Sequence, residues 1–114
     1  MIPEVLKHSA YYVELPSYAG YVIANTLTLS AGTWLLVSNI SFDTEANATY
    51  DHFLEYNNEL AAIVRGNMAN GGGTCAQCIL ETTQPATVKV QLRQYSDKHV
   101  CTHINNFTAI KIGK

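Results

Sequence analysis

Residues 87–93 read TVKVQLR, and this short segment decides the fold. Apolar and polar side chains alternate strictly along it, so that Val88, Val90 and Leu92 share one face of an extended chain. A period of two is typical of a strand in an antiparallel sheet that has one face in the core and the other in solvent. The segment therefore predicts a half-buried β-strand over residues 87–95.

The same alternation extends through the rest of the chain. Residues 26–42 alternate on both sides of a tight Ala31-Gly32 turn. Residues 50–65 are ambiguous because their apolar spacing also fits a helix. We favour a hairpin with a primed turn there, since Asn57 and Asn58 tolerate positive φ angles. The strands predicted in this way cover residues 8–15, 21–29, 33–42, 52–56, 59–66, 74–81, 87–95 and 107–112, with a short extra piece at 99–104.

This number of short strands predicts an all-β fold, an antiparallel two-sheet jelly-roll sandwich. The chain has 114 residues and a mass of 12.5 kDa, which leaves room for one core. We assign residues 1–7 to an N-terminal tether and residues 8–114 to a single domain. Charged residues make up only 14% of the chain, below the usual value of about 25%. We therefore expect copies of the chain to cover part of its surface.

Charge and hydropathy exclude several classes of partner. A net charge of −2 with seven Lys and Arg residues argues against nucleic acid. The uncharged stretch 15–42 is interrupted by Gly, Pro and polar residues and never reaches about 18 consecutive apolar residues, so no membrane insertion is expected. The first residues lack the basic and apolar regions of an export signal, which predicts synthesis and folding in a cytoplasm.

Three cysteines and a histidine are candidate ligands of a metal site. Cys75, Cys78, Cys101 and His103 have the content of a Cys₃His zinc centre. On a strand, residues three apart face opposite sides, so Cys75 and Cys78 could share a metal only in a knuckle. We expect ordinary buried, reduced thiols instead, with no metal or cofactor. No spacing supports a Cys-His nucleophile, and the glycine-rich loop lacks the residues of a phosphate cradle, so no enzymatic activity is expected.

The connections between the predicted strands alternate in length. Those at 30–32, 57–58 and 82–86 are short, and those at 43–51, 67–73 and 96–106 are long. Successive connections of an antiparallel chain alternate between its two ends, so the long ones share the end opposite both termini. Binding residues often lie on such loops. Side chains there that can hydrogen-bond a receptor are Asp43, Glu45, Asn47, Asn67, Asn70, Asp97 and His99. The alternative is that these loops are merely solvated.

Four elements together resemble a known family. They are residues 27–36 (LTLSAGTWLL), the Asn-centred hairpin, the strand 87–95 and the ending 107–112 (FTAIKI). In this order they resemble the C1q/TNF-like jelly-roll heads of phage virion proteins, over roughly residues 8–113. The chain departs from many relatives at Gln84-Pro85-Ala86, where they carry an acidic residue, and no coiled-coil or collagen-like shaft precedes the head.

The resemblance implies a homotrimer without enzymatic activity, in a virion assembled in the host cytoplasm. A trimer interface is also the interpretation we favour for Tyr11, Tyr12 and Tyr21, because an amphipathic phenol suits a protomer boundary. Stacking of these rings on a sugar is the alternative.

The leading hypothesis is therefore a trimeric head at a tail-fibre or baseplate tip that binds a host-surface receptor, a saccharide, through the long-loop end. Its partners would be itself, other virion proteins and the host glycan. A capsid decoration or cement protein is the first alternative. An enzyme or metal-binding domain is the second.

Overall fold

The computed structural model describes residues 4–10, 12–16, 20–43, 48–67, 73–97 and 99–114. Within these ranges the chain forms nine strands and no helix, as the all-β prediction requires. The strands are β1 (Val5–Ser9), β2 (Glu14–Leu15), β3 (Val22–Leu29), β4 (Gly32–Asp43), β5 (Thr49–Tyr56), β6 (Glu59–Asn67), β7 (Gly73–Thr82), β8 (Ala86–Tyr95) and β9 (Val100–Gly113). In the described ranges there is consequently no helix that could span a bilayer.

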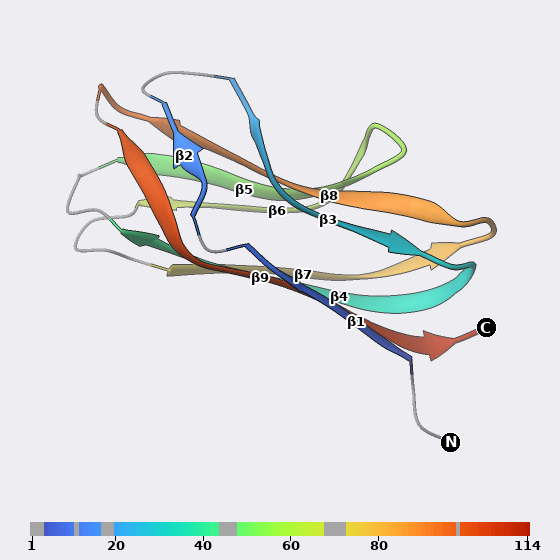
Figure 1. Ribbon diagram of the computed structural model, residues 1–114. Coiled ribbons are helices and arrows are strands. Elements are labelled where there is room, and N and C mark those ends of the chain that lie inside the picture. The colour runs from blue at the N-terminus through green and yellow to red at the C-terminus, as the bar shows by residue number, and fades with distance from the viewer. Residues whose placement is uncertain (1–3, 11, 17–19, 44–47, 68–72, 98) are drawn as a thin grey trace.

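The strands form two antiparallel sheets that face each other (Figure 1). One has the order β1-β9-β4-β7, with β2 also paired to β9, and the other has the order β3-β8-β5-β6. Each sheet therefore interleaves strands from the first and second halves of the chain, which is the arrangement of a jelly roll. The predicted two-sheet jelly-roll sandwich is confirmed.

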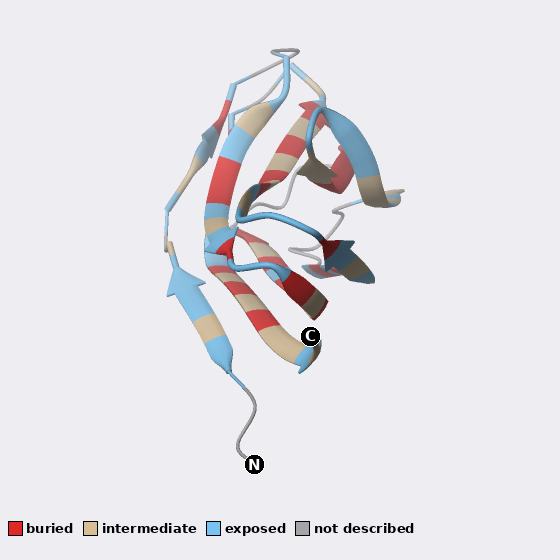
Figure 2. Ribbon diagram, turned by 90° about the vertical axis from the view of Figure 1, so that its right-hand side faces the viewer, coloured by how far each residue is buried: buried red, intermediate tan, exposed pale blue. Residues whose placement is uncertain are grey.

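The core lies between the sheets and is built by the period-two pattern. Val88, Val90 and Leu92 of the segment TVKVQLR are fully buried, as predicted. Trp34 and Phe107 are the largest fully buried side chains of the opposite sheet. Figure 2 shows the resulting bands of buried and less buried residues along the strands. Burying each large apolar side chain contributes about 1.5–3 kcal/mol to the free energy of folding. Burial of the apolar side chains on the inner faces is therefore the main force that holds the two sheets together.

The ambiguous segment forms a hairpin. Strands β5 and β6 pair with each other, and the turn residues Asn57 and Asn58 have φ angles of 52° and 60°. Positive φ at both central positions defines the primed turn whose twist matches that of the flanking strands. The hairpin prediction is confirmed, and the helical alternative is wrong.

Two predicted strands differ from the structure. The first begins at Val5, inside the segment expected to be a tether, and it is divided into β1 and β2. The pieces predicted at 99–104 and 107–112 are one continuous strand, β9, which contains Asn105 and Asn106. Asn105 interrupts the apolar pattern because its amide hydrogen-bonds inside the sandwich, donating to the carbonyl of Ala24 and accepting from Asn25. A buried polar residue with these partners does not end a strand.

The two ends of the sandwich differ as the connection lengths predict. Thr49 pairs with both Asn67 and Tyr95, and Ser41 pairs with Gly73, so the strand ends that flank the long connections gather at one end. The C-terminal residue of β9 pairs with Thr33 at the other end, where the short connections lie (Figure 1).

Candidate functional site

A cluster of polar and aromatic side chains lies on the outer face of the β3-β8-β5-β6 sheet, near the end with the long connections. The sheet register puts Asp51 of β5 between Arg93 of β8 and Arg65 of β6. Tyr95 is the last residue of β8, and Tyr21 comes directly before β3. We call these five residues the Asp51 cluster.

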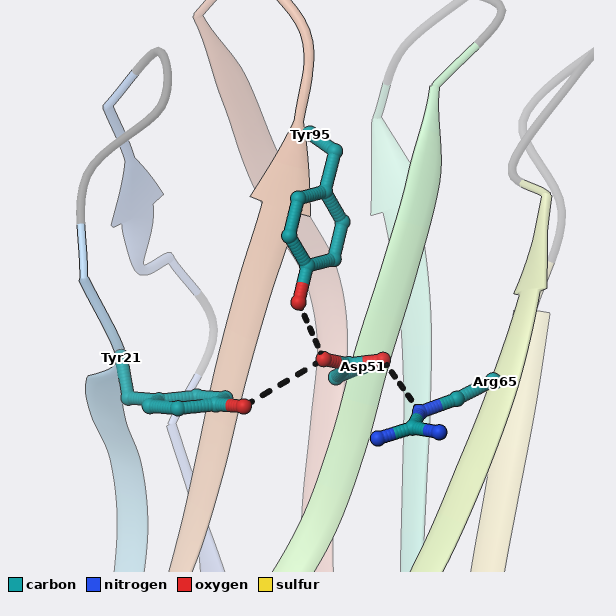
Figure 3. Close-up of polar contacts among 4 residues, drawn as sticks. All are labelled: Tyr21, Asp51, Arg65 and Tyr95. Carbon is teal, nitrogen blue, oxygen red and sulfur yellow. Dashed lines mark hydrogen bonds and ion pairs between the residues drawn. The ribbon is translucent and has the colours of Figure 1, made fainter.

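Asp51 is the centre of the cluster. Its side chain is almost completely buried, and three donors surround it (Figure 3). Oδ1 accepts a hydrogen bond from Nε of Arg65 at 3.0 Å, while Oδ2 accepts from the hydroxyls of Tyr95 at 2.5 Å and Tyr21 at 3.4 Å. A buried carboxylate needs such partners, because leaving it unpaired would cost several kcal/mol. The three donors therefore fix the carboxylate in one orientation.

Tyr95 is kept protonated by this contact. The hydrogen bond to Asp51 raises the pKa of the Tyr95 phenol above its ordinary value, with smaller contributions from burial and from the negative charge of Asp51. Ionising the phenol would place two negative charges next to each other. At ordinary pH Tyr95 is consequently a neutral donor to the carboxylate.

Arg93 connects the two tyrosines. The carbon at the centre of its guanidinium lies 4.8 Å from the ring centroid of Tyr95 and 5.4 Å from that of Tyr21. Both distances are within the range of a cation–π interaction. The Tyr21 ring also packs edge-on against Phe53 at 4.7 Å. Nε of Arg93 is buried and has no hydrogen-bond partner among the described residues.

An open cavity of about 690 Å³ lies beside the cluster. Its lining residues are Thr49, Tyr50, Asp51, Arg65, Gly66 and Tyr95. Gly66 leaves room for the Tyr50 ring, because a Cβ at position 66 would lie 2.7 Å from the Tyr50 hydroxyl oxygen. The described residues that line the cavity all belong to strands β5, β6 and β8.

The residues predicted to bind a receptor lie around this end but are not brought together as a site. Asp43 and Asn67 are the last residues of β4 and β6, and Asp97 and His99 are exposed between β8 and β9. Glu45, Asn47 and Asn70 lie outside the described residues. Receptor binding by these side chains stays a prediction.

The tyrosines predicted at a trimer interface have different surroundings. Tyr21 belongs to the Asp51 cluster and is partly exposed, at 44%. Tyr12 is largely exposed and accepts a hydrogen bond from the thiol of Cys101 at 3.1 Å. Tyr11 lies outside the described residues. A role of any of them in a trimer stays a prediction.

The candidate zinc ligands are separated along the β1-β9-β4-β7 sheet. Cys75 pairs with Asn39, whereas Cys101 pairs with Asp43 further along β4. Among the described residues no three His, Cys, Asp or Glu side chains come close enough to hold a metal ion. The expectation that all three thiols are buried is wrong for Cys75, which is exposed because it lies on the outer face. Burial raises the pKa of the Cys78 thiol.

Sequence reasoning did not identify four members of the Asp51 cluster. Asp51, Arg65, Arg93 and Tyr95 are ordinary outward positions of alternating strands, and nothing in their spacing distinguishes them. The available signal was a charged residue at an outward position of two predicted strands, Arg65 in 59–66 and Arg93 in 87–95, whereas Asp51 fell in the connection predicted at 43–51. Their contact depends on which strands are neighbours, and the sequence pattern does not contain that information.

The comparisons with known proteins give a structural likeness only. No protein-family model matches the chain, and no curated protein matches it. Among solved structures, it is similar to the VP2 subviral particle of infectious bursal disease virus, with a TM-score of 0.66 and 9% sequence identity over 96% of this chain and 33% of that chain. Structures of the Gx and Gt strains of that virus give TM-scores of 0.68 and 0.58, with 10% and 9% identity.

The chain therefore spans about a third of the length of the viral chains that it matches. At this identity the likeness establishes the fold. It agrees with a jelly roll of the kind found in a viral protein and gives no support to the resemblance to phage C1q/TNF-like heads.

Proposed function

We propose that this chain is a structural jelly-roll domain of a virion, which assembles with further copies of itself or with other virion proteins and catalyses no reaction. The observation that carries the proposal is the likeness of 96% of the chain to part of a protein that forms a subviral particle. A rigid sandwich with two broad outer faces suits such a role, because both faces are available for contacts with neighbours.

The outer face of the β1-β9-β4-β7 sheet supports assembly. The register aligns four apolar residues across it, Val5, Ile110, Leu35 and Ile79, which we call the apolar row. Ile79 and Val5, on the two edge strands, are 66% and 53% exposed. A row of uncharged apolar side chains across the outer face of a sheet is typical of a contact with another subunit. A second copy of this chain is the partner that we propose.

The same likeness supports a position in the capsid. A protein similar to part of a particle-forming chain belongs more naturally to a capsid, as a shell or decoration domain, than to a tail-fibre tip. Receptor binding at the end with the long connections is the second candidate function. It is supported by the preformed Asp51 cluster and its cavity, which lie at that end. The phage host and the homotrimeric state also remain proposals.

The experiment is to locate the chain in intact particles by electron microscopy with an antibody against it, and to compare particles with and without it. A capsid role predicts labelled heads, and particles without the chain that lose infectivity on heating or osmotic shock. A receptor role predicts labelled tails and a loss of adsorption. Absence of the chain from purified particles would contradict both.

A further inference from the structure

The cavity beside Asp51 offers hydrogen-bond donors to a ligand. The carboxylate of Asp51 is already occupied by its three donors. Arg65 uses only Nε in that contact, its side chain is 72% exposed, and its two terminal nitrogens have no partner among the described residues. A guanidinium with both terminal nitrogens free matches the planar geometry of a carboxylate and can bind it with two parallel hydrogen bonds.

The charges around the cavity favour a ligand with one negative charge. Arg65 and Arg93 carry two positive charges and Asp51 carries one negative charge, which leaves one positive charge. Arg93 does not line the cavity, but it lies next to Asp51 in the register and over the ring of Tyr95, which does. Its buried Nε has no hydrogen-bond partner in the part of the chain that the structure describes, so there the positive charge of Arg93 is only partly compensated.

The walls of the cavity favour a sugar ring as the carrier of that charge. Tyr95, which is 38% exposed as a residue, contributes an aromatic side chain to the lining, and Thr49 contributes a hydroxyl. An aromatic ring packs well against the apolar C–H face of a pyranose. The volume of about 690 Å³ lies within the range of small-molecule sites, which is roughly 300–1,000 Å³. A protein surface would need a larger and flatter area.

We propose that the Asp51 cluster is a binding site for a carboxylated monosaccharide unit, a uronic or sialic acid. Arg65 binds the carboxylate, Tyr95 packs against the pyranose ring, and Asp51 positions both of them. The proposal rests on the geometry of the cluster and deepens the second candidate function, receptor binding. It is independent of the proposed assembly role, so either of the two can fail without the other.

The test is a titration of the full chain, followed by amide chemical shifts in NMR spectra, with glucuronic acid and N-acetylneuraminic acid as probes. Glucose and inorganic phosphate serve as the neutral and the non-sugar anionic comparison. We expect weak binding of at least one acidic sugar, with shifts concentrated at Thr49, Asp51, Arg65 and Tyr95. Binding of glucose or phosphate as tight as that of the acids, or no binding of either acid, would overturn the proposal.

Substitutions distinguish a specific contact with Arg65 from a nonspecific effect of the net charge of the protein. Arg65→Gln should weaken binding of the acidic sugar by about tenfold or more, and Arg65→Lys should restore only part of it because an ammonium lacks the fork geometry. Lys7→Gln removes the same charge from an exposed position on the other sheet and should leave binding unchanged. Circular dichroism verifies that each variant is folded. Equal binding by folded Arg65→Gln and the unaltered chain would show that Arg65 is not part of a site.

Discussion

His52 is a titratable residue enclosed between the two sheets. Its ring nitrogens lie 2.9 Å from Oγ of Ser38 and 3.2 Å from Oγ1 of Thr74, so β5 of one sheet is joined to β4 and β7 of the other. Burial lowers the pKa of His52 from 6.5 to about 4. A buried histidine of this kind is neutral in the folded protein, and the same residue in the unfolded chain takes up a proton first.

Stability should therefore decrease on acidification. The contribution of His52 is fully present above the unfolded pKa of about 6.5 and is lost as the pH falls toward about 4. From about pH 7 to about pH 5, this linkage should remove about 2 kcal/mol of the free energy of unfolding. Urea unfolding at the two pH values measures it. His52→Gln should remove this part of the pH dependence, whereas His103→Gln, at an exposed position, should keep it. An unchanged dependence in His52→Gln would refute the assignment.

The ionisation of Tyr95 depends on its hydrogen bond to Asp51. The hydrogen bond to Asp51 is the largest cause of the raised pKa of Tyr95. Asp51→Asn removes the negative charge and should move the pKa of Tyr95 back toward its ordinary value of about 10. NMR of the chain labelled with ¹³C-tyrosine can follow each phenol during a pH titration. Tyr56, on the opposite face of β5, provides the internal reference signal.

At the scale of elements, the turn between β5 and β6 depends on two asparagines. Asn57 and Asn58 both occupy the left-handed region of backbone conformations. Residues with other side chains than Asn, Asp or Gly lose about 1–2 kcal/mol there, because Cβ approaches the backbone. The hairpin register is fixed by this turn, and β6 is an edge strand that, among the described residues, pairs within its sheet only with β5.

A pair of substitutions tests the turn. Asn58→Val should reduce the free energy of unfolding by about 1 kcal/mol or more, and Asn58→Gly should leave it equal or raise it slightly. Thermal unfolding followed by circular dichroism gives the comparison. Equal stability of the two variants would mean that the turn is not under this conformational constraint.

At the scale of the whole molecule, the sandwich combines a low fraction of charged residues with apolar side chains on an outer face. Only 14% of the residues are charged, and the apolar row lies exposed on the outer face of the β1-β9-β4-β7 sheet. An isolated subunit with such a face tends to associate, because association removes the row from water. We therefore expect the contact between copies of the chain to lie on the apolar row.

Self-association should be sensitive to charge at that location. Ile79→Glu places a carboxylate in the apolar row and should shift the chain toward monomers in sedimentation velocity. Ile23→Glu makes the same change at a residue of similar exposure on the outer face of the other sheet, and should have less effect. If the unaltered chain sediments as a monomer at every concentration, the proposed assembly of this chain with itself is wrong.

The predictions from the sequence agree best with the structure for features that depend on a few neighbouring residues. The alternation at Val88, Val90 and Leu92 predicted both the strand and its buried face, and the Asn57-Asn58 pair predicted the turn. The prediction failed where polar residues lie inside the sandwich. Asn105 looked like the end of a strand, yet it is buried and hydrogen-bonded within β9.

The sequence by itself determined most of the strands, the buried face of the strand at 87–95 and the end of the sandwich where the long connections lie. These properties depend on side-chain period and turn chemistry within a few residues. Only the tertiary structure decided that Asp51 lies between Arg65 and Arg93, with Tyr95 above them. The reason is that this contact depends on the register of three strands brought together by the jelly-roll order, and cross-strand pairing is a property of the whole chain.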